Sequence, residues 1–94
     1  MTLRDKIDQW IDDRGLEGVL MWDGLEEAFL GICGVYSREP IALFDFDSCV
    51  KIFIERDGMT YEEAVEWMDH NVSCAWIGEQ TPGFFERFDE KLDD

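Results

Sequence analysis

The beginning of the chain shows the apolar periodicity of an amphipathic helix. Positions i, i+4, i+7 and i+8 of this segment are apolar, and the positions between them are mostly charged. The apolar positions are Leu3, Ile7, Trp10 and Ile11. One apolar stripe at this spacing predicts a helix with a single buried face. Thr2 can cap the start of this helix, and Gly15 can cap its end.

Three short apolar runs follow, each about as long as a strand. They lie in residues 16–24, 26–37 and 39–46. The first run ends in Asp23 and Gly24, a pair that favours a tight turn, and the third begins at Pro40, where strands tolerate proline. Because the connections between the runs have the length of turns, the pattern predicts a three-stranded antiparallel meander.

Helical periodicity returns after the third run. From Asp47 or Ser48 onward the apolar residues fall on one side of a helix, and Gly58 is expected to end it. Thr60, followed three residues later by Glu63, is the capping-box pattern that opens a second helix. Since only a short connection separates the two helices, we expect them to form an αα-hairpin.

The rest of the chain mixes turn residues with apolar ones. Residues 73–88 predict a loop or a short strand that returns to the sheet, and residues 89–94 predict a solvated tail. Ninety-four residues suffice for one small domain with its own core. The predicted architecture for residues 1–94 is therefore a single α+β domain. It has an N-terminal helix, a three-stranded antiparallel meander, an αα-hairpin and a short C-terminal return strand or loop.

The net charge limits the possible partners. The chain has 23 acidic and 8 basic residues, which gives a formal net charge of -15 at pH 7. A field of this sign repels phosphate backbones and anionic lipid headgroups, and it accelerates encounter with basic surfaces. We therefore expect no direct binding to nucleic acid or membranes, and we expect the partner to present a basic protein surface. Disorder is not expected, because 14% of the residues are aromatic and 46% are hydrophobic.

The cysteines and the first residues bear on the compartment. Cys33, Cys49 and Cys74 are far apart in the sequence, lie among apolar neighbours and form no Cys-x-x-Cys pair. This spacing favours buried free thiols over a zinc ribbon or a redox motif. The chain shows no signal-peptide core, and no apolar run approaches the ~20 residues of a membrane span. We expect a soluble intracellular protein without a cofactor.

Asp45 and Asp47 allow a catalytic and a structural interpretation. Their spacing after an apolar run resembles the first motif of haloacid-dehalogenase-type phosphotransferases, in which one aspartate attacks phosphorus and the other works as acid and base beside Mg²⁺. Cys49 stands where that motif expects Thr or Val, and too little chain follows for a doubly wound domain. In the structural interpretation Asp45 ends a strand, and Asp47 or the neighbouring Ser48 caps a helix.

His70 is the only histidine of the chain and lies near the end of the second hairpin helix. It could join Asp45 and Asp47 around a cation. An imidazole in this position more often interacts with the negative end of the helix dipole.

Two rows of carboxylates lie at helical spacing. They are Glu62, Glu66 and Asp69 in the second hairpin helix, and Asp5, Asp8 and Asp12 in the first helix of the chain. Neighbours in such a row lie about 5 to 6 Å apart, close to the phosphate spacing along one nucleic-acid strand. The rows could imitate a phosphate backbone and occupy the basic groove of a DNA- or RNA-handling protein. The alternative is an acid-rich surface that only keeps the protein soluble.

A longer pattern spans "RDGMTYEEAVEWMDHNVSCAWIGEQTPGFF" at residues 56–85. It consists of Gly58, Met59, Tyr61 to Ala64, Trp67, Asn71, Ala75, Trp76, Gly78, Glu79, Thr81 and Pro82. With the upstream "LMWDGLEEAFLGI" and "PIALFDFDSCV", this pattern resembles a family of small uncharacterised proteins encoded by phages, prophages and plasmids. The resemblance covers roughly residues 16–85. It implies a mobile-element origin and a shared fold, and it carries over no catalytic residue.

The charge and the resemblance together predict a non-enzymatic, acidic protein-binding module that acts in the host cytoplasm. Its expected role is to inhibit a host nucleic-acid-handling defence complex, of the anti-CRISPR or anti-restriction type, by nucleic-acid mimicry through the two carboxylate rows. A second hypothesis is an accessory protein of the mobile element that binds its partner through an apolar or aromatic patch around Trp76 and Phe84. A third is a small metal-dependent enzyme at Asp45, Asp47 and His70.

Overall fold

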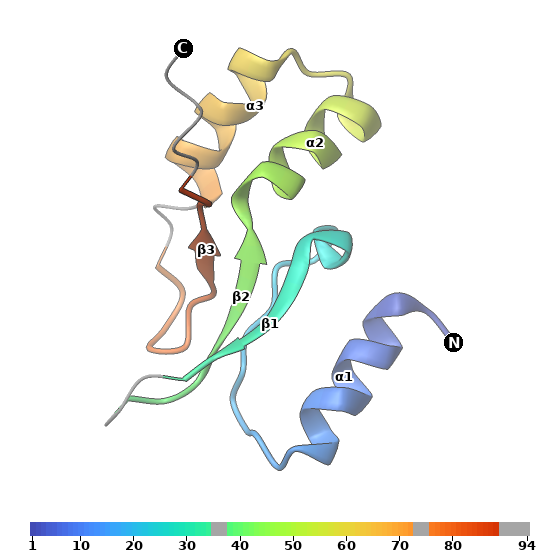
Figure 1. The fold of residues 1–94 in the computed structure, drawn as a ribbon, viewed down its shortest axis with the longest axis vertical. Helices are drawn as coiled ribbons and strands as arrows, with labels where there is room; N and C mark the ends of the chain where they lie inside the picture. Colours follow the sequence, from blue (N-terminus) through green and yellow to red (C-terminus); the bar gives the residue numbers. More distant parts are fainter. Residues whose placement is uncertain (35–37, 73–75, 89–94) are drawn as a thin grey trace.

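The computed structural model describes residues 1–34, 38–72 and 76–88 and shows an α+β fold (Figure 1). The elements are α1 (Leu3–Asp13), the 3₁₀ turn η1 (Glu26–Ala28), β1 (Phe29–Cys33), β2 (Ile41–Asp45), α2 (Phe46–Asp57), α3 (Tyr61–Trp67), the π-helical turn η2 (Met68–Val72) and β3 (Gly83–Phe85). Figure 1 shows the α2–α3 hairpin at one end of the molecule, α1 at the other, and the strands between them. The predicted α+β class is confirmed. The predicted tail at residues 89–94 lies outside the described residues.

Helix α1 forms where the apolar stripe predicts it. Thr2 is its N-cap: the Thr2 side chain accepts a hydrogen bond from the Asp5 N–H at 3.1 Å, and the Thr2 N–H donates to the Asp5 carboxylate at 3.2 Å. This reciprocal pair is a capping box. Ile7 and Ile11 are buried, and the ring of Trp10 meets that of Phe29 edge to face at 6.2 Å.

The sheet is mixed, with the order β1-β2-β3. Strands β1 and β2 pair antiparallel with Phe29 opposite Phe44, and a bulge interrupts the ladder between Phe29 and Gly31. Strand β3 pairs parallel to β2, with Phe84 opposite Phe44. A parallel neighbour needs a long crossover, and the α2–α3 hairpin lies within that connection. The predicted short return strand is therefore present, as the third strand of the sheet.

The predicted antiparallel meander is wrong in its first strand. Residues 16–24 form no strand, and β1, with which they were expected to pair, is an edge strand of the sheet. The apolar residues 19–22 are instead all partly buried, and Val19, Met21 and Trp22 pack against the core. Four consecutive partly buried side chains lack the in-and-out alternation of a strand with one face in the core.

Asp45 is both the last residue of β2 and the N-cap of α2. Its carboxylate accepts hydrogen bonds from the Ser48 N–H at 3.0 Å and from the Ser48 hydroxyl at 2.6 Å. The prediction that Asp45 ends a strand is confirmed, whereas the prediction that Asp47 or Ser48 caps the helix is wrong. Asp47 lies in the first turn, and its negative charge there is favourable to the helix dipole. Gly58 ends α2 with φ 72°, as predicted.

Helix α3 starts with the predicted capping box. The Thr60 side chain accepts from the Glu63 N–H at 3.1 Å, and the Thr60 N–H donates to the Glu63 carboxylate at 2.9 Å. After Trp67 the helix widens into the π-helical turn η2. The α2–α3 hairpin is thus confirmed, with α3 shorter than the predicted second helix.

The main core lies between the sheet and the hairpin. Phe44, Cys49 and Met68 are its largest fully enclosed side chains, and Ala42 and Ala64 are also 0% exposed. Cys49 is therefore a buried thiol as predicted, Cys33 is partly buried, and Cys74 lies outside the described residues. No helix in the described part of the chain is long and apolar enough to cross a membrane.

Candidate functional site

The carboxylates of the α3 row, defined as Glu62, Glu66 and Asp69, all lie at the surface. Glu62 and Glu66 belong to α3, and Asp69 belongs to η2. All three residues are exposed. None of them has an ion-pair or hydrogen-bonding partner for its carboxylate among the residues that the structure describes. The α3 row therefore presents three uncompensated negative charges to solvent.

A surface groove runs beside the α3 row. This hairpin groove has a volume of about 460 Å³ and lies between the turn that joins α2 to α3 and the exposed side of α3 and η2. Its lining residues are Asp57, Gly58, Met59, Glu63, Glu66, Trp67, His70 and Asn71. Of the α3 row, Glu66 lines the groove, and Glu62 and Asp69 do not. The structure thus places one member of the row at a concave site.

The three carboxylates of the hairpin groove differ in how they are engaged. Asp57 accepts hydrogen bonds from the Arg56 guanidinium at 3.1 and 3.2 Å. Glu63 is held by the capping box of α3. Glu66 has no such partner in the described part of the chain, so it is the carboxylate that can pair with an incoming cation without breaking an existing contact.

Trp67 forms an aromatic wall of the hairpin groove. Its ring meets the ring of the buried Phe53 edge to face at 6.5 Å, which fixes one side of the indole against α2. The residue is nevertheless 45% exposed. An aromatic surface next to an unpaired carboxylate suits a cationic group.

Trp67 and His70 were not among the predicted partner-binding residues. Their relation to the acidic positions is visible in the sequence, because Glu63 and Trp67, like Glu66 and His70, are four residues apart and share a helix face. The sequence gives no sign that the turn at Gly58 and Met59 closes a groove over that face. That closure follows from the packing of α3 on α2.

The carboxylates of the α1 row, defined as Asp5, Asp8 and Asp12, are also exposed but largely engaged. Asp5 belongs to the capping box of α1, and Asp8 pairs with the Arg4 guanidinium at 3.0 Å. Asp12 has no side-chain partner among the described residues. The three carboxylates border a shallow hollow of about 450 Å³ with Met1 and Gln9.

Arg4 pairs with several of the negative charges near α1. Besides Asp8, its guanidinium contacts Asp23 at 2.6 Å and Glu26 at 3.5 Å. Its hydrogen bonds to Asp23 and Asp8 raise its pKa above the ordinary value. Since Figure 1 shows α1 and the α2–α3 hairpin at opposite ends of the molecule, the two rows do not form one continuous surface.

The proposed cation site at Asp45, Asp47 and His70 is not assembled. Asp45 is engaged by Ser48, whereas Asp47 and His70 are exposed. Among residues 1–34, 38–72 and 76–88, no group of three or more His, Cys, Asp or Glu side chains is placed to hold a metal ion. Burial raises the pKa of the neighbouring Cys49 thiol to about 12, and the charge of Asp45 adds to this shift. The thiol is thus kept neutral near pH 7, which makes it a poor nucleophile.

The predicted aromatic patch around Trp76 and Phe84 is divided. Trp76 is 74% exposed and lines a hollow of about 680 Å³ with Arg38, Glu39 and Glu79. Phe84 packs instead on the core, with its ring 6.1 Å from that of Phe44. Only the Trp76 half of the patch is therefore fully available to a partner.

Comparison of the chain with known protein families, with curated proteins and with solved structures found no match. The properties of its surface therefore carry the functional argument.

Proposed function

We propose that this protein is an acidic, non-enzymatic protein-binding module that engages a basic surface on its partner. The observation that carries this proposal is the state of the α3 row: three exposed carboxylates without a partner in the described residues. Side chains held in this state can pair with an incoming cation without giving up an existing contact. They also repel one another, which costs folding stability and favours binding of a cationic partner.

The basic residues of the chain strengthen this proposal. Arg4 is shared among three carboxylates, and Arg56 is directed to Asp57 and to the carbonyl oxygen of Gly24, the latter at 2.7 Å. Neither arginine compensates the α3 row. The net charge of -15 therefore leaves an acidic surface, which attracts basic proteins over long range.

The finer proposal is nucleic-acid mimicry. The α3 row would stand in for successive phosphates in the basic groove of a host nucleic-acid-handling defence complex, of the anti-CRISPR or anti-restriction type, and thereby inhibit it. The α1 row would contribute secondary contacts through Asp12. The mobile-element origin that the resemblance implies would place this action in the host cytoplasm.

The test is capture of the partner from host extract, followed by measurement of its affinity. The charge-reversal variant Glu62→Lys, Glu66→Lys and Asp69→Lys is compared with a matched control, Glu17→Lys, Glu55→Lys and Glu86→Lys, which changes the net charge equally at other exposed positions. We expect the α3-row variant to lose at least about a hundredfold in affinity, since each rim charge pair contributes up to ~1 kcal/mol and the reversed charges repel. The control should lose much less.

Salt and nucleic acid provide the second half of the test. Binding should weaken as salt rises, and added DNA or RNA should displace the module from its partner. Equal affinity of the α3-row variant and the wild type, or binding that is insensitive to salt, would refute the proposal. Salt-sensitive binding that nucleic acid does not displace would refute mimicry alone.

A second candidate function rests on Trp76. Its indole is exposed beside Arg38, Glu39 and Glu79, an arrangement in which an aromatic anchor is surrounded by polar residues, as in many protein–protein contacts. An accessory protein that binds through this hollow would lose its partner in Trp76→Ala and keep it in the α3-row variant.

A further inference from the structure

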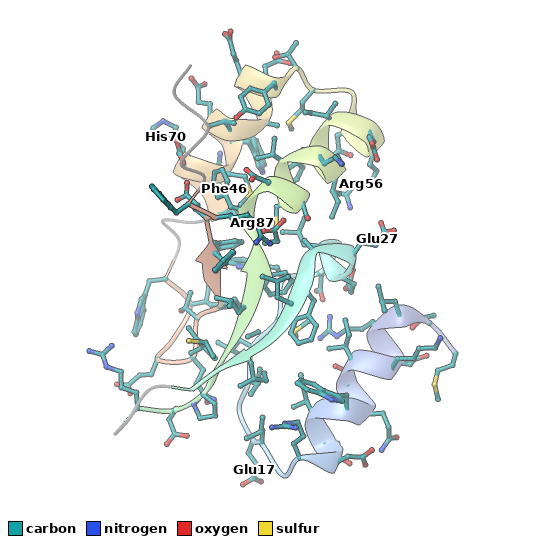
Figure 2. The ribbon with its side chains drawn as sticks, viewed as in Figure 1. Glu17, Glu27, Phe46, Arg56, His70 and Arg87 are labelled. Carbon is teal, nitrogen blue, oxygen red and sulfur yellow. The ribbon has the colours of Figure 1, made fainter. Side chains whose placement is uncertain are left out.

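The hairpin groove has the chemistry of a receptor for a cationic side chain. Its ionisable lining consists of three carboxylates and His70, and its apolar lining includes Met59 and Trp67. Arg56 belongs to α2 and lies on the side of the hairpin opposite His70 (Figure 2), and its guanidinium donates hydrogen bonds to Asp57 and to the carbonyl oxygen of Gly24. The groove is therefore not filled by a cation of the described part of the chain.

The arginines of the chain show how guanidinium groups meet its aromatic rings. Arg14 lies 4.9 Å from the ring of Trp10, Arg56 lies 5.8 Å from Phe53, and Arg87 lies 5.6 Å from Phe85. No arginine of residues 1–34, 38–72 and 76–88 lies over Trp67. The chain thus forms three internal contacts between an arginine and an aromatic ring, and the exposed indole of Trp67 could accept a fourth from a partner.

From this geometry we infer that the hairpin groove binds an arginine side chain of the basic partner, with the guanidinium stacked on Trp67 and paired with Glu66. This inference rests on the proposed function and names the anchor of the interaction. Arginine fits better than lysine, because a planar guanidinium can stack on an indole while its edge donates two hydrogen bonds to one carboxylate. The ammonium group of lysine is a point charge that gains less from the aromatic wall.

Charge complementarity distinguishes this occupant from the alternatives. A nucleic-acid base could also stack on Trp67, but its phosphates would approach a protein of net charge -15. A second copy of the chain would bring the same net charge. An arginine of a basic protein brings the opposite charge and meets a carboxylate with no existing partner to displace.

The test uses the 94-residue chain with two defined probes, the peptides octa-arginine and octa-lysine. These probes have equal length and charge, so a diffuse attraction to the acidic surface gives equal affinities. Titration is followed by NMR through the indole N–H resonance of Trp67, assigned from its loss in Trp67→Phe. We expect octa-arginine to bind about two- to fivefold more tightly than octa-lysine, the worth of a cation–π contact at an exposed site. We also expect it to shift the Trp67 indole resonance.

Two pairs of variants test the named contacts. Glu66→Gln should weaken octa-arginine binding about tenfold, as expected for loss of one charge-assisted hydrogen-bonded pair. Glu17→Gln removes the same charge at the opposite end of the molecule (Figure 2) and should change the affinity less than about twofold. Trp67→Leu should abolish the preference for arginine over lysine, whereas Trp76→Leu, at an exposed indole outside the hairpin groove, should preserve it.

The outcomes separate this inference from the function on which it rests. Tight binding of octa-arginine with a Trp67 shift that depends on Glu66 supports it. Equal binding of the two peptides with an unmoved Trp67 resonance overturns it and leaves the acidic module intact. If neither peptide binds at low salt, the proposed function fails as well.

Discussion

The two acidic rows have nearly the same spacing along their helices, but their carboxylates serve different purposes. In the α1 row, Asp5 completes a capping box and Asp8 pairs with Arg4. The capping box of α3 is completed by Glu63, which is not a member of the α3 row. No basic residue of the described chain pairs with Glu62, Glu66 or Asp69. Whether the carboxylates of a row can bind a partner therefore depends on whether nearby backbone N–H groups or arginines already engage them.

This difference separates folding from binding. Carboxylates that cap a helix or hold an arginine stabilise the folded state and are already occupied. Carboxylates without partners repel one another in the folded state, and their favourable pairing with a cation comes only when a partner binds. On this basis the carboxylates of the α1 row serve mainly the fold, whereas those of the α3 row are available to a partner.

The two regions also differ in how they are anchored. Met68 is 0% exposed in the main core beneath the hairpin, whereas Ile7 is 6% exposed and packs outside that core. We expect Met68→Ala to lower the free energy of unfolding by about 4 kcal/mol and Ile7→Ala by about 2 kcal/mol, because a cavity beneath α1 can collapse more easily. Urea unfolding followed by circular dichroism measures both. A larger loss for Ile7→Ala would place the dominant anchor at α1.

The buried thiol of Cys49 makes the stability of the hairpin region depend on pH in the alkaline range. Burial raises its pKa from an ordinary value near 9 to about 12. Below pH 9 its contribution to stability is fully present. As the pH rises above 9 the unfolded thiol ionises while the folded thiol keeps its proton, so stability falls by up to about 1.4 kcal/mol per pH unit until the pH passes 12.

The measurement compares urea unfolding of the wild type, Cys49→Ala and Cys33→Ala at pH 8, 9 and 10. Lysine and tyrosine titrations are common to all three proteins, so the difference isolates the thiol. The alkaline decline should be smaller in Cys49→Ala than in the wild type, and Cys33→Ala, which removes a partly buried thiol, is the matched control. Parallel declines in the wild type and Cys49→Ala would contradict the assignment.

The elements that local sequence determines were predictable. Thr2, Thr60 and Gly58 cap helices because a side-chain oxygen or a glycine at those positions satisfies groups within the same few residues. Strands β1 and β2 follow from two apolar runs with a short connection. The predicted N-cap of α2 was Asp47 or Ser48, and the observed N-cap is Asp45. The sequence could not separate the two aspartates, because either carboxylate could accept from a free N–H of the first turn.

The elements that depend on distant packing were not predictable. Strand β3 has only three residues, and its parallel pairing with β2 follows from the crossover through the hairpin. Residues 16–24 look like a strand because their side chains are apolar, yet their backbone finds no partner strand. The hairpin groove likewise depends on how α3 packs against the turn at Met59, so helical spacing could predict Glu66 but could not predict the wall that Trp67 provides.

The smallest expected effect tests the comparison between the rows most directly. Asp5→Ala removes the carboxylate that closes the capping box of α1, and we expect a loss of about 0.5–1 kcal/mol in the free energy of unfolding. Glu66→Ala removes one of several repelling charges and introduces the residue with the highest helix propensity, so we expect a gain of up to ~0.5 kcal/mol.

Salt distinguishes the two causes. The electrostatic part of the Glu66→Ala gain should shrink between 0.05 and 1 M NaCl, because salt screens repulsion between exposed charges, and only the part due to helix propensity should remain. The Asp5→Ala loss comes from a short-range hydrogen bond and should persist. Urea unfolding at both salt concentrations measures the four values. If Glu66→Ala destabilised the protein as much as Asp5→Ala does, Glu66 would be serving the fold, and the α3 row would no longer be set apart from the α1 row as the surface free for a partner.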